Sequence, residues 1–248
     1  MNNNKFIIQE SLYDFPYHYI PHFNKNGTPS LSRKLGWGFD YLCYMKHLQK
    51  LVISMNPNSV LEVGCGDGYF IGNLPTSIPI RVGVDVSSKA IAFAKAFHPN
   101  CVFYDFDAEK IEDKFDVVIV IEVLEHIPDD ELSFFFQTLS KKVKQEGKII
   151  VSVPTTVVPL NNKHYRHYTI ELFENQLKFS GINFKIVNVE YVFSSPLWLK
   201  TLTRLFDNRF FGLEIKSLMR LAWNQIWRKH RIVNKKYGVH MVVELIKN

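Results

Sequence analysis

The spacing of apolar residues changes along the chain, and each spacing predicts a different kind of element. Over residues 31–54 apolar side chains recur roughly every 3.6 positions, from Leu35 to Val52, which predicts one or two amphipathic helices. From residue 59 to about residue 193, short apolar runs alternate with amphipathic stretches. Such alternation of strand and helix patterns predicts a parallel sheet with helices on both faces.

Seven apolar segments predict the strands of this sheet. In chain order they read SVLEVG, IRVGVDV, CVFYDF, FDVVIVI, KIIVSVP, INFKIVNVEYV and YGVHMVVELI. Ser87 and Thr169 stand immediately before helical segments, where a hydroxyl accepts a hydrogen bond from the first free backbone N–H groups. The helical segment 129–144 begins with acids and ends with lysines, as the helix dipole favours.

The same pattern divides the chain into four segments. We expect residues 1–58 to form an aromatic and helical extension that caps the substrate and cofactor, 59–193 to form the core, and 237–248 to supply its final strand. Residues 194–236 form a helical insertion with ten Lys and Arg against two acids, a charge of +8 (10 − 2). The whole chain carries +6, so the positive charge is concentrated in this insertion.

Composition narrows the class of protein. Apolar residues make up 46% and charged residues 22%, which is ordinary for a globular protein. The three cysteines, Cys43, Cys65 and Cys101, form no C-x-x-C pair, which argues against a zinc ribbon and a disulfide framework. No apolar run resembles a signal peptide or a membrane-spanning helix. We therefore expect a cytoplasmic protein, or one that is peripheral at the inner face of a membrane.

A glycine-rich turn follows the first predicted strand. Gly64, Gly66 and Gly68 have the spacing G-x-G-x-G, and glycine lets a backbone adopt positive φ and approach a ligand closely. Glu62 and Asp67 flank the glycines, and these acids would repel the pyrophosphate of a dinucleotide. They suit instead a ligand with a cationic amine and a sulfonium.

Two further acids follow the next strands. Asp85 ends the second strand, where a carboxylate accepts hydrogen bonds from ribose hydroxyls. Asp107, in the sequence D-A-E, follows the third strand, where it would meet an adenine amino group. Together with the turn, these acids predict an adenosine cofactor that bears a sulfonium.

This order of motifs resembles the class I S-adenosylmethionine-dependent methyltransferases. The sequence E-V-L-E-H after the fourth strand resembles the ubiquinone-biosynthesis O-methyltransferases and their bacterial relatives. The resemblance covers about residues 59–190 and implies a Rossmann-like, doubly wound α/β sheet of seven strands with the last strand antiparallel. It also implies S-adenosylmethionine as cofactor and S-adenosylhomocysteine as product. The implied cofactor contacts are Glu62, Gly64, Cys65, Gly66, Asp67, Gly68, Asp85, Val86, Asp107, Ala108 and Glu122.

Three histidines are candidates for a catalytic base. His126 lies just past the fourth strand, and His164 and His167 lie in the H-Y-R-H-Y loop after the fifth strand. These positions share the carboxyl edge of the sheet, where such folds bind ligands. Histidine is the natural proton acceptor near neutral pH, and a hydroxyl acceptor must lose a proton when it is methylated.

The cluster of Glu122, Glu125 and His126 has a second interpretation. It resembles the metal-binding segment of the small-RNA 3′-terminal 2′-O-methyltransferases and of some quinone methyltransferases. In the RNA enzymes a downstream histidine completes the site, and His164 or His167 could serve. Two carboxylates and an imidazole suit Mg²⁺, Mn²⁺ or Zn²⁺. Because the same motif occurs in relatives that use no metal, we expect none here.

The function predicted from the sequence is O-methylation of a small-molecule or glycan-like acceptor, including a lipid-linked one. The alternatives are a metal-dependent RNA 2′-O-methyltransferase and a module that binds the cofactor without catalysis; the three histidines argue against the module. Basic and aromatic residues interleave through 194–236, which favours an anionic membrane surface as partner over nucleic acid. A helical lid over the sheet is the alternative interpretation of that segment.

Overall fold

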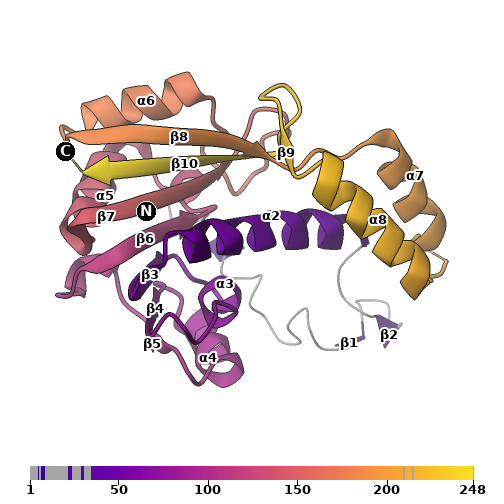
Figure 1. Ribbon diagram of the computed structural model, residues 1–248, viewed down its shortest axis with the longest axis horizontal. Helices are drawn as coiled ribbons and strands as arrows, with labels where there is room; N and C mark the ends of the chain where they lie inside the picture. The colour runs from indigo at the N-terminus through magenta and orange to yellow at the C-terminus, as the bar shows by residue number, and fades with distance from the viewer. Residues whose placement is uncertain are drawn as a thin grey trace.

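A computed structural model describes residues 35–208, 210–213 and 215–247, together with positions 5, 7, 8, 22, 23, 29 and 30. Within these residues eight strands form one sheet, in the order β5-β4-β3-β6-β7-β10-β8-β9 (Figure 1). In chain order its strands are β3 (Ser59–Val63), β4 (Ile80–Val84), β5 (Val102–Tyr104), β6 (Phe115–Ile121), β7 (Val143–Pro154), β8 (Phe184–Val192), β9 (Ile232–Val233) and β10 (His240–Lys247). A separate pair joins β1 (His22–Phe23) to β2 (Pro29–Ser30).

The direction of the strands confirms the predicted doubly wound α/β sheet. Strands β3 to β7 pair in parallel, whereas β10 is antiparallel to both of its neighbours, β7 and β8. The seven expected strands are therefore present, with the last antiparallel. The eighth strand, β9, pairs with the edge of β8 over two residues, and a segment that short leaves no periodic pattern in the sequence.

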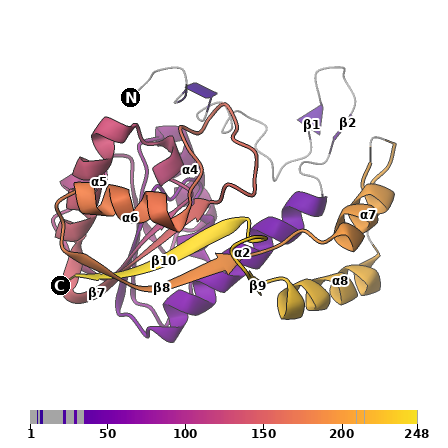
Figure 2. The same ribbon diagram turned by 90° about the horizontal axis from the view of Figure 1, so that it is seen from above.

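Helices cover both faces of the sheet (Figure 2). The α-helices are α2 (Leu35–Ser54), α3 (Tyr69–Gly72), α4 (Ser88–Phe97), α5 (Asp129–Lys142), α6 (Ile170–Phe179), α7 (Leu197–Phe206) and α8 (Lys216–Lys229). Alternate side chains of β6 divide between two buried clusters. Val117 and Ile119 pack with α2, α3 and α4, and Val118 and Val120 pack with α5 and α6. Each such buried side chain contributes about 1.5–3 kcal/mol to stability.

The predicted helix starts are confirmed in atomic detail. The Ser87 side chain accepts a hydrogen bond from the backbone N–H of Ala90, and Thr169 accepts one from Leu172. Helix α5 ends two residues earlier than the pattern predicted. The chain continues directly into β7, and Val143 already pairs with Phe115, so sheet pairing displaces the last half-turn of helix.

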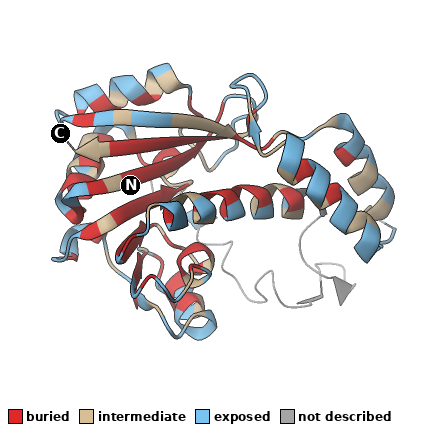
Figure 3. Ribbon diagram, viewed as in Figure 1, coloured by how far each residue is buried: buried red, intermediate tan, exposed pale blue. Residues whose placement is uncertain are grey.

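The insertion forms a helical pair, α7 and α8, that packs against α2 at one end of the molecule (Figures 1 and 3). Its inner side chains are buried, whereas much of its outer surface is exposed (Figure 3). Among the described helices, none combines the length and apolar character needed to cross a lipid bilayer. Most of the expected N-terminal extension, residues 1–34, lies outside the described residues, and the four-segment division stays a prediction.

Candidate active site

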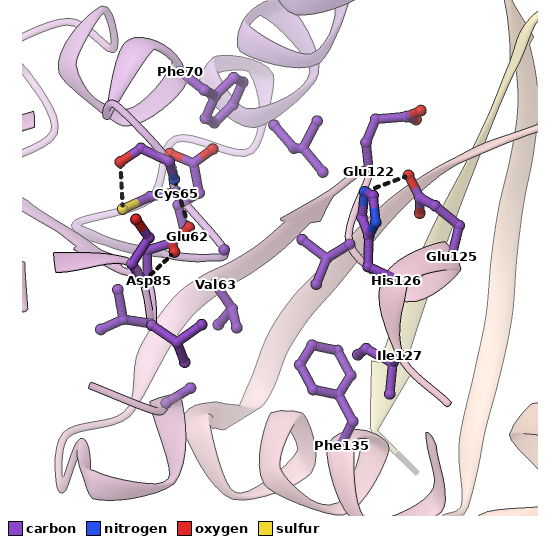
Figure 4. Close-up of a pocket in the computed structure, with 18 of the residues that line it drawn as sticks. Glu62, Val63, Cys65, Phe70, Asp85, Glu122, Glu125, His126, Ile127 and Phe135 are labelled. Carbon is purple, nitrogen blue, oxygen red and sulfur yellow. Dashed lines mark hydrogen bonds and ion pairs between the residues drawn. The ribbon is translucent and has the colours of Figure 1, made fainter. Parts of the chain in front are cut away.

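A cavity of about 780 Å³ opens at the carboxyl edge of the parallel strands. This volume falls within the range of small-molecule sites. The turn after β3 and the ends of β4 and β6 line one side, and α2 contributes Trp37, Tyr41 and Tyr44 to the other. The loop before α6 adds His164 and Tyr165, so segments from most of the core meet here. Figure 4 shows the part of this cavity between Glu62 and Asp85 on one side and Glu125 and His126 on the other.

The glycine turn adopts the backbone that its sequence predicts. Gly64, Gly66 and Gly68 have φ values of 76°, 53° and 76°, the region that favours glycine. A Cβ atom at Gly64 would lie 2.4 Å from a methyl carbon of Val123. Gly68 is not among the residues that line the cavity, and a Cβ there would lie 2.8 Å from the ring of Phe103. The lack of a side chain at Gly68 therefore allows the turn to pack against Phe103, whereas Gly64 and Gly66 line the cavity.

Glu62 joins the first strand to the following helix. Its Oε2 atom accepts a hydrogen bond of 3.1 Å from the backbone N–H of Ile71. Burial raises the pKa of Glu62 well above its usual value, and the N–H of Ile71 opposes that rise. Asp67 likewise accepts from the backbone N–H of Tyr69, at 3.1 Å. Both acids line the cavity while they also hold α3 in place.

Asp85 locks the end of β4 to the glycine turn. Its Oδ2 accepts from the backbone N–H of Gly66 and its Oδ1 from that of Ser87, each at 2.9 Å. A carboxylate oxygen has two lone pairs, so Asp85 keeps acceptor capacity toward the cavity. The remaining predicted cofactor contacts that line the cavity are Cys65, Val86, Asp107, Ala108 and Glu122.

These residues fit S-adenosylmethionine by the chemistry of their donors and acceptors. The cationic amine and sulfonium suit a wall that carries Glu62, Asp67 and Asp85. Asp107 accepts from the backbone N–H of Glu109 at 2.8 Å and starts the short helix η2 (Ala108–Lys110), whose buried residue Ala108 lines the cavity. The cavity therefore combines acids, which suit the positive charge and hydroxyls of the cofactor, with apolar surface that suits its ring.

The three candidate bases lie together. The His126 and His164 rings meet edge to face with centroids 4.7 Å apart, and His164 Nδ1 lies 2.7 Å from His167 Nε2. His126 and His164 line the cavity, whereas His167 lies behind them and is buried. Burial lowers the pKa of His126 to about 4 and of His164 to about 3. Both imidazoles are therefore neutral at pH 7.

The hydrogen bonds assign a tautomer to each neutral ring. Because a carbonyl oxygen only accepts, His167 Nδ1 donates to Val158 O at 2.8 Å, which leaves His167 Nε2 as an acceptor. His164 Nδ1 then donates to it, and the lone pair of His164 lies on Nε2. His126 Nδ1 donates to Lys163 O at 3.3 Å, so its lone pair is also on Nε2.

Glu125 completes this cluster from the short helix η3 (Leu124–His126). The side chain is fully buried, and neither carboxyl oxygen has a hydrogen-bond partner among the described residues. Its Oε1 lies 3.9 Å from His126 Nε2 (Figure 4). Glu125, His126 and His164 each offer a ligand atom within 4.8 Å of the others, which is an arrangement that suits a divalent cation. Glu122 is outside this group.

Glu122 belongs instead to a buried ion-pair network. His240 Nδ1 donates to Glu122 Oε1 at 3.2 Å, and His240 Nε2 donates to Asp40 Oδ1 at 3.0 Å. Burial alone lowers the pKa of His240, but the two carboxylates outweigh it and raise the pKa to about 10. Tyr44 stacks on the charged ring with centroids 4.1 Å apart. Glu122 has φ +53°, an unusual value that its side-chain bonds to His240 and Ser152 hold in place.

The sequence interpretation missed Asp40, Tyr44 and His240. A polar signal was present, because His240 begins a strand of apolar residues and Asp40 lies one turn before Tyr44 on an apolar helix. It also missed Lys5, whose ammonium donates to the carbonyls of Asn162 and His164 at 3.0 and 2.9 Å and lines the cavity. No periodic or motif signal marks Lys5.

Comparison with known proteins identifies the family. The family model described as "Methyltransferase domain" matches residues 39–188. The "Ubiquinone biosynthesis O-methyltransferase" of Pelagibacter ubique (strain HTCC1062) is 27% identical over 204 residues, which cover 76% of this chain and 75% of the relative. Magnesium protoporphyrin IX methyltransferase from Synechocystis PCC 6803, solved with bound SAM, superposes with a TM-score of 0.58 at 15% identity and covers 99% of this chain and 97% of that one.

The methyltransferase domain of the bacterial protein CtHen1-C superposes with a TM-score of 0.56 at 16% identity, over 84% of this chain and 98% of that one. At this identity the two solved structures show the shared fold. The family match spans the glycine turn, the acids at the strand ends and the histidine cluster. The chain belongs to the methyltransferase-domain family and is a class I S-adenosylmethionine-dependent methyltransferase.

Proposed function

We propose that this enzyme methylates an oxygen atom of a small-molecule or glycan-like acceptor, lipid-linked acceptors included, in the cytoplasm. One observation carries the proposal: the acids that fit the cofactor and the neutral histidines line the same cavity. Aromatic side chains, among them Trp37, Tyr41 and Phe135, also line it and suit a ring-shaped acceptor. The free thiols of Cys43 and Cys65 agree with a reducing compartment.

The bound cofactor supplies an activated methyl group, and the chain's own residues align the acceptor and receive its proton. His164 Nε2 is the strongest candidate for the base, because His167 accepts from His164 Nδ1–H and so leaves the lone pair of His164 on Nε2. The amide nitrogen of Asn161 lies 3.3 Å from this atom, so the acceptor hydroxyl would replace or share that contact. Lys5, bonded to the His164 carbonyl, closes this side of the cavity. The relative from Pelagibacter ubique is named as an O-methyltransferase, which supports oxygen as the methylated atom.

The experiment is a methyl-transfer screen with radiolabelled cofactor against quinols, phenols, glycans and RNA. His164→Ala should lower kcat about 10²–10⁴-fold with unchanged affinity for S-adenosylhomocysteine, because proton acceptance is lost and cofactor contacts remain. His126→Ala tests the second base in the same way. His167→Ala should act less strongly, since His167 only orients His164.

His98→Ala is the matched control. His98 ends α4 and is not among the residues that line the cavity, so its loss should leave turnover unchanged. Full turnover in the His126, His164 and His167 variants would show that another group accepts the proton. Cofactor binding without transfer to any acceptor would favour the non-catalytic module.

A second candidate function is metal-dependent 2′-O-methylation of RNA. The observation that favours it is the unpartnered, buried carboxyl of Glu125 beside the Nε2 lone pairs of His126 and His164. A divalent cation there would satisfy the carboxylate and orient the hydroxyls of a ribose. The absence of a metal requirement stays our prediction for the first function.

Chelation separates the two functions. Under the first function, activity survives EDTA and elemental analysis of the purified protein gives no stoichiometric metal. Under the second, EDTA abolishes activity, Mg²⁺ or Mn²⁺ restores it, and RNA is the preferred acceptor. Glu125→Gln discriminates further, because it should abolish metal-restored activity while cofactor binding persists.

A further inference from the structure

We propose that the α7–α8 pair docks the enzyme onto an anionic lipid surface. The docking surface is the tip of this pair: the end of α7, the loop 207–215 and the start of α8, of which positions 209 and 214 lie outside the described residues. Figures 1 and 2 place this pair at the end of the molecule away from the sheet. The inference concerns a second surface and stands apart from the methyl-transfer site.

Large apolar side chains are exposed on this surface. Phe210 is 77% exposed and Leu221 67%, although a folded protein gains by burying such side chains. The surface carries further exposed apolar residues: Leu205, Phe211, Leu213 and Ile215. Within this small region, apolar exposure is therefore concentrated enough to mark an interaction site.

The exposed apolar residues do not belong to an unfilled core position. Each helix already has a separate buried face, because Leu199 of α7 and Ala222 and Ile226 of α8 are buried against α2. Helix α8 is further held by Trp227, whose ring lies under the cations of Lys50 and Arg231. The outer face of α7 and α8 therefore stays exposed although the inner face is packed against α2. The alternative interpretation, a helical lid whose apolar residues all pack over the sheet, does not account for these exposed side chains.

Positive charge surrounds the apolar tip. Arg204 of α7 and Lys216 and Arg220 of α8 are exposed beside it, and Lys200 is exposed one turn before Arg204. Asp207 is the acid among the described residues of the connecting loop. An amphipathic helical surface with basic residues flanking Leu and Phe matches the interface of an anionic bilayer, where apolar groups enter the acyl boundary and cations meet phosphates. A second copy of this basic surface lacks that charge complementarity.

The surface connects to the active site through one helix. Helix α2 packs against α7 and α8, and its residues Trp37, Tyr41 and Tyr44 line the cavity. The α7–α8 pair that carries the docking surface therefore packs on the same helix that forms one wall of the cavity. This geometry would give the enzyme access to acceptors that partition into the membrane.

The test is co-sedimentation of the full chain with vesicles, and it requires no methyl transfer. With vesicles of phosphatidylglycerol and phosphatidylcholine we expect binding that falls at least about tenfold between low and high salt. Binding to pure phosphatidylcholine should be weak. Lys216→Glu/Arg220→Glu should lower partitioning at least about twentyfold, since each basic residue near an anionic surface is worth on the order of fivefold. Phe210→Ser/Phe211→Ser should lower it even at low salt.

Matched controls lie on the other side of the sheet. Phe179 on α6 is 85% exposed, so Phe179→Ser removes a comparable apolar group from another surface. Lys141→Glu/Lys178→Glu makes the same charge change on α5 and α6. Both controls should bind vesicles as the parent protein does. Circular dichroism melts of all variants establish that each is folded.

Three results would overturn the proposal. The first is equal, negligible binding to anionic and neutral vesicles. The second is a concentration-dependent dimer that Phe210→Ser/Phe211→Ser abolishes, without vesicle binding, which would make the tip a self-interface. The third is binding of single-stranded RNA without vesicle binding, which would assign the charge to nucleic acid.

Discussion

Asp85 performs two tasks with one carboxylate. It accepts backbone N–H groups from the glycine turn and from the start of α4, and it faces the cavity. Its contribution to cofactor binding and its contribution to the shape of the turn are therefore coupled. The substitutions Asp85→Ala and Asp85→Asn help to separate these two contributions, because asparagine keeps one acceptor oxygen and alanine keeps none.

Asp85→Ala should weaken binding of S-adenosylhomocysteine about 100-fold, since hydrogen bonds to a charged group are worth roughly 1.5–3 kcal/mol. Asp85→Asn should lose less, because one oxygen remains. Isothermal titration calorimetry measures both. Asp105→Ala is the control, since this neighbouring acid bonds Ser88 and is not among the cavity-lining residues. Unchanged affinity in Asp85→Ala would remove Asp85 from the cofactor site.

His240 is a buried cation between two carboxylates, and its loss is a second test at this scale. His240→Gln should destabilise the fold by about 3–5 kcal/mol at pH 7, because it leaves Asp40 and Glu122 without their counterion. The folded pKa of about 10 lies above the usual 6.5. The stabilisation is therefore complete below about pH 6.5, declines above it, and is gone once the pH passes about 10.

Urea unfolding at a series of pH values measures this contribution. The difference in unfolding free energy between the wild-type protein and His240→Gln should shrink as the pH rises from 7 toward about 10. Because tyrosines and lysines that titrate in the same pH range contribute equally to both proteins, their contributions to the unfolding free energy cancel in this difference. A difference that is constant with pH would mean that His240 is not the charged member of this network.

At the scale of elements, the turn between β3 and α3 depends on two separate constraints at Gly64. The residue has positive φ, and a Cβ atom would overlap Val123, which follows β6. The turn and the segment after β6 therefore lie against each other with no room for a side chain. This close approach holds the two strand ends that shape the cavity.

Gly64→Ala should destabilise the protein by about 2–4 kcal/mol, the sum of backbone strain and overpacking. It should also weaken cofactor binding, because the turn must move. Gly181→Ala isolates the strain, since Gly181 also has positive φ but open space around it, and should cost about 1–2 kcal/mol. Adding Val123→Ala to Gly64→Ala should recover the part of the lost stability that comes from the clash with Val123, but not the part that comes from backbone strain. Equal losses at Gly64 and Gly181 would contradict the clash.

At the scale of the whole molecule, the cavity lies between the sheet edge and α2, and a ligand that fills it would contact both. Anything that binds only the folded state stabilises it, by about 2.7 kcal/mol at a concentration of 100 times Kd. For a domain of this size, S-adenosylhomocysteine should therefore raise the Tm by about 5–10 °C.

Differential scanning fluorimetry measures this shift. NAD at the same concentration should give none, because the acids of the turn disfavour a pyrophosphate. The Asp85→Ala protein should show a much smaller response. A shift with NAD and none with S-adenosylhomocysteine would contradict the assigned cofactor.

Local patterns determined much of this protein. The alternating apolar runs predicted seven strands and their helices because burial on two faces constrains residues two or four positions apart. The glycine spacing and the acids at strand ends predicted the cofactor edge, because the carboxyl ends of parallel strands meet at one edge. The loop that carries His164 leaves that same edge, so its meeting with His126 was also predictable.

Tertiary structure decided what sequence spacing does not encode. His240 and Asp40 are 200 positions apart in the sequence. They pair because β10 lies beside β7 in the sheet and α2 packs over the end of β10 where His240 lies. The different environments of Glu122 and Glu125 likewise depend on packing. The Glu122 carboxylate accepts a hydrogen bond from His240, whereas the Glu125 carboxyl is buried beside His126 without a hydrogen-bond partner among the described residues. Charge and burial at these sites depend on neighbours from distant segments, so only the folded chain fixes their tautomers and pKa values, from which the proposed role of His164 as base is argued.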